Sequence, residues 1–80
     1  MQITFTQHAL AMLTERGIAE EWVRRTLAEP DDSAPDPSHP DRHRAFRAIA
    51  ERDGRVLRVV YSDATAERRV ITAFFDRGRR

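Results

Sequence analysis

Two arginines of this chain have the residue type and spacing needed to hold a phosphate group. Arg47 and Arg58 fall in two segments of strand-like alternation, and pairing these segments around Asp53-Gly54 makes the arginines diagonal neighbours on one sheet face. Two guanidinium groups so close repel each other unless an anion lies between them. A phosphodiester meets this need, and its charge rises in the transition state of cleavage. The alternative is that both arginines are solvated, or that they pair with Glu51 and a loop acid.

A threonine and a histidine complete the set of candidate catalytic residues. Thr72 is expected on the same face, where its hydroxyl can donate to a phosphate, although a threonine in a strand is also simply a common β-former. His8 falls in the first turn of an expected helix, where the positive end of the helix dipole favours a neutral imidazole. A neutral imidazole can act as a general base near pH 7. The alternative for His8 is a surface position without a role.

The other two histidines do not predict a metal site. His39 and His43 are four residues apart, a spacing that some zinc sites use, but they flank a proline in a loop and no third ligand accompanies them. The chain has no cysteine. We therefore expect neither a metal nor another cofactor, and contact with a substrate is the alternative role of His43.

Positive charge is concentrated in the second half of the chain. From residue 42 to the end there are eleven arginines and five acids, whereas residues 1–41 hold three arginines and eight acids. Lysine is absent, so every basic side chain is a planar guanidinium fork suited to phosphate. We expect four arginines to contact flanking nucleic-acid phosphates: Arg16, Arg44, Arg77 and Arg79. For the 77–80 tail, a solvated terminus is the alternative.

Length and composition indicate one small domain. Eighty residues support only a thin core, and the absence of cysteine excludes disulfides and thiolate metal sites. No segment approaches the roughly 18 apolar residues of a transmembrane helix, and no signal peptide opens the chain. We expect a cytoplasmic protein without a membrane partner, formed by a single domain over residues 1–80.

Local signals place two helices in the first half. Ile3 and Phe5 alternate with polar residues as in a short strand, and Thr6 can cap a helix that runs to about Arg16. Gly17 suits the left-handed position after a helix end. A second helix is expected over residues 20–28 and ends at Pro30. All four prolines of the chain then fall between residues 30 and 40, which predicts an extended loop over residues 30–41.

The second half alternates as an antiparallel meander. Asp53-Gly54 is a two-residue hairpin signal, and centring the turn there places Phe46 opposite Tyr61 and Ala48 opposite Val59. This register predicts an apolar face with the members Phe46, Ala48, Ala50, Leu57, Val59, Tyr61, Ile71, Ala73 and Phe75. The opposite face would carry the arginines together with Val60, Val70, Thr72 and Phe74. The expected fold is α+β, with two N-terminal helices on one face of an antiparallel meander of three to four strands.

Several segments together resemble a known family. Residues 3–9, 15–23, 27–31, 55–61 and 70–77 are similar, in this order, to the small prokaryotic domain-of-unknown-function family numbered 4258. That family looks related to BrnT-type toxins and, more distantly, to RelE-like toxins that cleave RNA at the ribosome. The resemblance implies a compact α+β fold and a role in a toxin–antitoxin or effector system. Family positions carry over to His8, Arg16, Arg47, Arg58, Thr72 and Arg77. Ala19 departs from the Ser or Thr that members often have, which weakens a helix cap.

The leading hypothesis is a metal-independent endoribonuclease of toxin type. RNA, either free or associated with the ribosome, would lie on the arginine face, and its 2′-hydroxyl would attack the neighbouring phosphorus. His8 would transfer the proton, while Arg47 and Arg58 would stabilise the developing charge. The alternatives are a non-catalytic nucleic-acid-binding module and a protein-interaction module whose partner is a cognate antitoxin or another acidic protein. Self-association through an exposed edge strand is also open.

Overall fold

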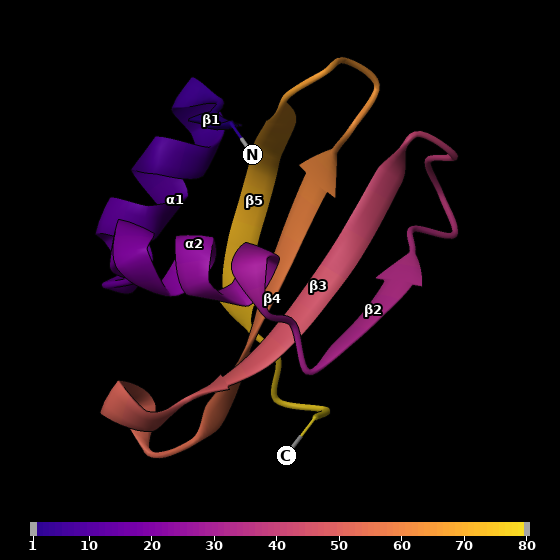
Figure 1. The fold of residues 1–80 in the computed structure, drawn as a ribbon. Coiled ribbons are helices and arrows are strands. Elements are labelled where there is room, and N and C mark those ends of the chain that lie inside the picture. The colour runs from indigo at the N-terminus through magenta and orange to yellow at the C-terminus, as the bar shows by residue number, and fades with distance from the viewer. Residues whose placement is uncertain (1, 80) are drawn as a thin grey trace.

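The chain folds into two helices that lie on one side of a five-stranded sheet (Figure 1). The computed structural model describes residues 2–79. The elements in chain order are β1 (Ile3–Phe5), α1 (Gln7–Arg16), α2 (Glu20–Ala28), β2 (Asp32–Pro35), β3 (Arg42–Ile49), the short 3₁₀ helix η1 (Ala50–Arg52), β4 (Arg55–Ser62) and β5 (Arg68–Phe75). The expected α+β class and the two-helix layer are confirmed. The sheet has one strand more than the upper expectation and is mixed, because β1 pairs with β5 in parallel.

Both helices begin and end where local sequence signals place them. The Thr6 hydroxyl accepts the Ala9 N–H at 3.0 Å and so caps α1. Gly17 closes the helix in the left-handed conformation, with φ at 65°. Ala19 supplies no side-chain cap to α2, as its residue type predicts. None of the helices in residues 2–79 is long and apolar enough to cross a membrane.

The proline-rich segment contains an edge strand where a loop was expected. β2 pairs with β3 in antiparallel fashion, and the Asp31 carboxylate accepts the Ala48 N–H at 2.9 Å to anchor the start of this pairing. Proline is tolerated here because an edge strand leaves one side without ladder partners. The Ser33 N–H is occupied by the Asp32 carboxylate at 2.8 Å and Pro35 has no N–H. This edge therefore offers few donors to another strand, which disfavours self-association through β2.

The register of β3 on β4 differs from the expected one by three positions. Phe46 lies opposite Arg58 instead of Tyr61, because residues 50–52 form η1 and lengthen the turn beyond Asp53-Gly54. Asp53 takes a left-handed conformation with φ at 58°, and the Gly54 N–H bonds to the Ile49 carbonyl. Side chains alternate between the two faces of a sheet. A register shift by an odd number of residues therefore moves each β3 side chain to the opposite face relative to the side chains of β4.

The helices cover a face formed by one alternate set of strand residues. Buried residues of this face include Ala45, Ile49, Leu57, Val59 and Ala73, and they pack with Val23 and Leu27 of α2. Val70 belongs to this core instead of the arginine face, since the register of β5 on β4 shifts between Val60 and Tyr61. The other side of the sheet, called here the open face, carries Arg42, Arg44, Phe46, Ala48, Val56, Arg58, Val60, Ser62, Arg69, Thr72 and Phe74. The expected inward positions of Phe46 and Ala48 are therefore wrong.

Candidate functional site

A row of four side chains crosses the open face from β2 to β5. Asp32, Phe46, Arg58 and Phe74 lie directly opposite one another in neighbouring strands. The guanidinium carbon of Arg58 is 5.4 Å from the ring centroid of Phe46 and 5.0 Å from that of Phe74. Arginine and phenylalanine thus alternate along the row, in the geometry of cation–π contacts.

The charge of Arg58 is met by a carboxylate from the end of β5. Its Nε and Nη2 donate to Oδ2 of Asp76 at 3.1 and 2.5 Å. The pair is partly buried, with 22% of the Arg58 side chain and 11% of the Asp76 side chain exposed. The Arg58 guanidinium, followed by the Gly78 N–H, holds the pKa of Asp76 below its ordinary value. Asp76 was not among the predicted site residues, because nothing in the sequence relates it to Arg58.

The C-terminal segment turns back across the open face and covers Phe46. The Gly78 N–H donates to Asp76 Oδ1 at 2.9 Å, and the Arg79 guanidinium carbon lies 3.6 Å from the Phe46 ring centroid. Arg79 also donates to Asp32 at 2.7 Å and thereby lowers the pKa of that carboxyl. Phe46 is only 2% exposed although no helix lies over it. The tail is folded onto the sheet up to Arg79, where it borders a hollow of about 430 Å³.

Arg44 lies at the open-face position beside Arg58 that was expected for Arg47. Arg44 lies opposite Val60, so it is the diagonal neighbour of Arg58 on the open face. Its Nε is 3.8 Å from an Asp36 oxygen. The pKa of Asp36 is lowered mainly by the Ser38 N–H and further by Arg44. The expected pair of diagonal arginines therefore exists, with a different first member.

Arg47 itself lies on the helix side of the sheet. It is opposite Leu57, and its Nη1 donates to the Glu29 carbonyl at the end of α2 at 2.5 Å. Asp31 lies 4.0 Å from the same nitrogen. The expected Arg47–Arg58 neighbourhood is thus wrong, because the three-position shift places the two arginines on opposite faces. Its contact with the α2 carbonyl gives Arg47 a role in holding the helix against the sheet.

Thr72 lies on the open face as expected, and a helix residue reaches it. Thr72 is opposite Val60 in β4. Arg16, the last residue of α1, donates to the Ala73 carbonyl at 2.8 Å and to the Thr72 hydroxyl at 3.5 Å. Its guanidinium carbon is 5.8 Å from the Phe74 ring centroid. Phe74 consequently has Arg16 near one side and Arg58 near another.

The structure does not bring His8 to this group. His8 is exposed in the first turn of α1, and no hydrogen bond to its side chain occurs among residues 2–79. Arg16, which does reach the open face, lies eight residues further along the helix, a rise of about 12 Å. The expected proton-transfer role of His8 therefore finds no support in the geometry.

The remaining histidines form contacts of their own. His43 Nε2 is 2.9 Å from an Asp63 oxygen, and its ring lies 5.4 Å from that of Tyr61 on the helix side. His39 Nδ1 is 3.8 Å from Asp36. Within the described part of the chain, no three histidine or acidic side chains are grouped closely enough to hold a metal ion.

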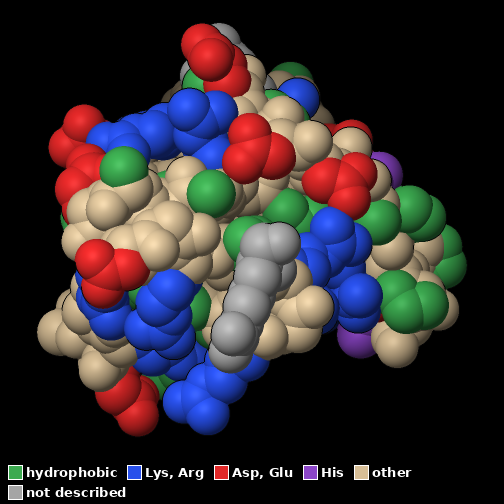
Figure 2. Space-filling model, turned by 90° about the horizontal axis from the view of Figure 1, so that it is seen from below, with side chains coloured by type: hydrophobic (Ala, Val, Ile, Leu, Met, Phe, Trp, Pro, Cys, Tyr) green, Lys and Arg blue, Asp and Glu red, His purple; other side chains and the backbone are tan. Residues whose placement is uncertain are grey.

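Surface charge is mixed over this end of the molecule. Figure 2, which views the molecule from below, shows arginine side chains in several groups with acidic side chains between them. On the open face this mixing has a specific form, since Arg44, Arg58 and Arg79 each have an aspartate partner. The face can therefore hold planar or anionic groups, and the carboxylate beside Arg58, that of Asp76, is itself engaged in an ion pair.

Comparison with known proteins gives a family assignment. The family model described as a domain of unknown function, DUF4258, matches residues 5–75. The match leaves out only four residues at the start and five at the end, so the chain belongs to this family. No curated protein matched the chain. No solved structure matched it either.

Proposed function

We propose that this member of the DUF4258 family is a single-stranded RNA-binding domain whose open face receives the strand. The observation that carries the proposal is the row in which Arg58 lies between Phe46 and Phe74. Proteins that bind single strands combine aromatic or guanidinium planes, on which bases stack, with basic groups that hold the backbone. Phe74 is half-buried and has an arginine on two sides, so it is the ring we assign to base stacking.

The arrangement of charge supports binding more than catalysis. Arg58 and Arg44 have aspartate partners that weaken the field on an incoming phosphate. His8 lies away from the face. A ligand would gain stacking first and would then compete with these carboxylates for the guanidinium groups. A protein partner of acidic character, such as an antitoxin, would compete for the same groups.

The test is fluorescence anisotropy with a labelled single-stranded RNA. Phe74→Leu removes the ring but keeps an apolar side chain, and it should weaken binding about 5-fold or more, the lower end of what one stacked base contributes. Phe5→Leu is the matched control, since Phe5 is also half-buried and has Arg24 over its ring at 5.3 Å, but it lies in β1 and packs against the helix-side core instead of the open face. Equal affinities of the wild type and Phe74→Leu would refute the proposal.

A toxin-type, metal-independent endoribonuclease is the second candidate. The observation that favours it is the grouping of the Thr72 hydroxyl with Arg16 and, through Phe74, with Arg58. A phosphodiester held there would be cleaved when the 2′-hydroxyl attacks phosphorus, which gives a 2′,3′-cyclic phosphate and a 5′-hydroxyl end as the proton passes to the leaving oxygen. The resemblance to BrnT-type and RelE-like toxins adds to this candidate.

Cleavage is separated from binding by incubating RNA with the protein in the presence of a chelator. Cyclic-phosphate fragments that are lost with Arg58→Gln and kept with His8→Ala would establish cleavage on the open face. A strand with 2′-deoxy sugars should then be bound and left intact. RNA that is bound but never cut would support the binding role and exclude the cleavage role.

A further inference from the structure

Four arginines lie near the end of β5: contacts place three of them beside β5 and the α1–α2 junction, and the fourth lines one hollow with Arg55. We call them the edge cluster, and its members are Arg16, Arg52, Arg55 and Arg77. Two of them flank one ring, because the guanidinium carbons of Arg52 and Arg55 each lie 4.9 Å from the Phe75 ring centroid. These two carbons can thus be no farther apart than twice that distance.

The cluster is held in place by backbone and aromatic contacts. Arg52 donates to the Gly17 carbonyl at 3.1 Å, which joins the turn to the end of α1. Trp22 of α2 lies edge-to-face with Phe75 at 6.3 Å and supports the ring on which the arginines rest. Arg16 is fixed by the Ala73 carbonyl at 2.8 Å. These are neutral partners, so they orient the guanidinium groups without cancelling their charge.

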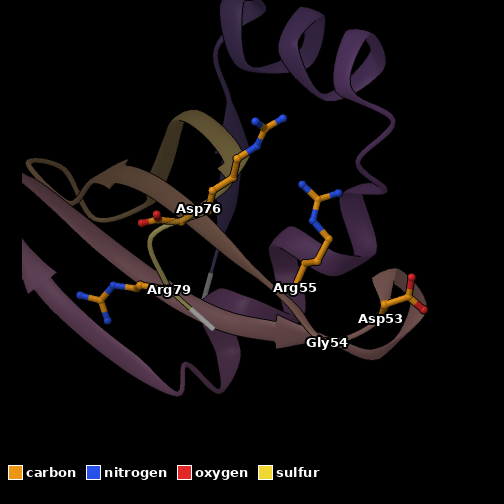
Figure 3. Close-up of a pocket in the computed structure, with 6 residues that line it drawn as sticks. Asp53, Gly54, Arg55, Asp76 and Arg79 are labelled. Atoms are coloured by element: carbon orange, nitrogen blue, oxygen red, sulfur yellow. The ribbon is translucent and has the colours of Figure 1, made fainter.

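None of the four guanidinium groups has a carboxylate within 4.0 Å in the described part of the chain. This distinguishes the edge cluster from the three open-face arginines at the same end of the molecule, Arg44, Arg58 and Arg79, each of which is paired with an aspartate; Arg42 and Arg69, which have no such partner among residues 2–79, lie toward the opposite end of that face. Asp53 is the acid nearest in sequence to Arg55, and Figure 3 shows its carboxylate pointing away from that arginine. The uncompensated positive charge at this end of the molecule therefore lies at the sheet edge, where it attracts an anion most strongly.

A hollow adjoins the cluster. It has a volume of about 350 Å³ and is lined by Asp53, Gly54, Arg55, Asp76, Arg77 and Arg79. Figure 3 shows Arg55 pointing away from Asp76 and Arg79, so the arginines around the hollow point in different directions. The two aspartates leave the hollow with an excess of positive charge. A phosphate group suits such a place, since guanidinium forks bind its oxygens with charge-assisted hydrogen bonds.

We infer that the edge cluster binds the phosphodiester backbone of the RNA strand whose bases rest on the open face, an inference that rests on the proposed function. Arg16 connects the two surfaces, because it belongs to the cluster and also approaches Thr72 and Phe74. The strand leaves the open face at Phe74 and passes around the free part of the β5 edge. Contacts of this kind fix the path of the strand without reading its sequence.

Salt-dependent binding of single-stranded RNA tests the inference. Arg55→Gln and Arg77→Gln each remove one charge and no described hydrogen bond or carboxylate partner, whereas Arg52 is left in place because it anchors the turn. Each variant should lower the slope of log affinity against log salt by about 0.7, the value for one phosphate contact of a single strand. Arg24→Gln removes the same charge from α2 and should leave the slope unchanged. Unchanged slopes for Arg55→Gln and Arg77→Gln would overturn the inference.

A second probe separates this inference from the proposed function. Inorganic pyrophosphate, titrated into ¹⁵N-labelled protein, should shift the amide signals of Gly54, Arg55 and Arg77 more than those of Arg24 and its neighbours. Pyrophosphate shifts without RNA binding would keep the anion site and refute the proposed function. The opposite result is RNA binding that depends on Phe74, with wild-type salt slopes for Arg55→Gln and Arg77→Gln and no pyrophosphate shifts. It would keep the proposed function and refute phosphate binding by the edge cluster.

Discussion

The Arg58 guanidinium lies between two phenylalanine rings and forms an ion pair with Asp76. Both Nε and Nη2 of Arg58 donate to one carboxylate oxygen, and the rings of Phe46 and Phe74 flank the guanidinium plane within 5.4 Å. The pair keeps a basic group in place on an otherwise apolar part of the sheet. It also lowers the net charge that an RNA strand meets there, so stability and affinity are coupled through one contact.

Replacing Asp76 with asparagine should separate these two effects. Asp76→Asn removes the negative charge and leaves Arg58 free to contact phosphate, so RNA affinity should rise. Stability should fall by about 1–2 kcal/mol, the worth of hydrogen bonds to a charged group reduced for partial exposure. Urea unfolding and anisotropy measure the two quantities. Asp63→Asn, which affects the more exposed pair with His43, is the control and should change neither. Unchanged stability of Asp76→Asn would contradict the structural role of the pair.

Acid should destabilise the fold through its paired carboxylates. The hydrogen bond from Arg25 lowers the pKa of Glu51 from 4.5 to about 2, and arginine partners lower those of Asp32 and Asp76. A carboxyl whose pKa is lower in the folded state stabilises it fully above the ordinary value. That contribution disappears as the pH falls through the folded value. The loss for Glu51 therefore falls between pH 4.5 and about 2.

Denaturant unfolding between pH 7 and pH 2 checks this dependence. Glu51→Gln should show a smaller decrease in stability over the acid range than the wild type, because its contribution is already absent. Glu20→Gln, an exposed helix position without an ion pair in the described residues, should retain the full decrease. Identical acid profiles for Glu51→Gln and the wild type would show that the Arg25–Glu51 pair contributes nothing.

The end of α1 should tolerate asparagine better than alanine. Gly17 has φ at 65°, a region that costs a residue with a Cβ about 1 kcal/mol. An added Cβ would approach Arg52 Nη1 no closer than 3.7 Å, so the cost comes from the backbone and not from a clash. Gly17→Ala should lower the free energy of unfolding by about 1 kcal/mol, and Gly17→Asn by less, as measured with urea. Equal stabilities of the two variants would argue against a left-handed cap.

The parts of the fold set by neighbouring residues were predictable from the sequence. Thr6 and Gly17 mark the ends of α1, and Pro30 follows α2, because caps and breakers act within a few residues. Family resemblance was predictable in the same way, from segments that match in order. The apolar alternation of β4 and most of β5 also identified the correct helix-facing side for Leu57, Val59 and Ala73.

The register of β3 was not predictable because its alternation fits both faces. Ala45 and Ile49 can face inward, and so can Phe46, Ala48 and Ala50. The choice depends on contacts across the chain, namely Asp31 with the Ala48 N–H and Arg47 with the Glu29 carbonyl. Phe46 can face outward only because Arg58 and Arg79 cover it. These contacts come from segments 12 to 33 residues away, which explains why β2 and the folded tail were also missed.

The exchange of Arg44 for Arg47 on the open face yields the last prediction. Arg44→Gln should weaken RNA binding and lower the salt slope by about 0.7, since it removes a phosphate contact. Arg47→Gln should leave both unchanged and instead lower stability by about 1 kcal/mol, because the bond to the α2 carbonyl is lost. The two variants remove the same charge from positions three residues apart, so each serves as the control for the other. Anisotropy at several salt concentrations and urea unfolding measure the effects.

The register behind this exchange can also be observed without RNA. Cross-strand nuclear Overhauser effects should connect Ala45 with Val59, and Arg47 with Leu57, as in the structure. The alternative register would connect Ala48 with Val59. If Arg47→Gln weakened RNA binding and left stability intact, Arg47 would have to lie on the open face. The Overhauser pattern would then have to follow the alternative register, in which Arg47 shares a face with Arg58.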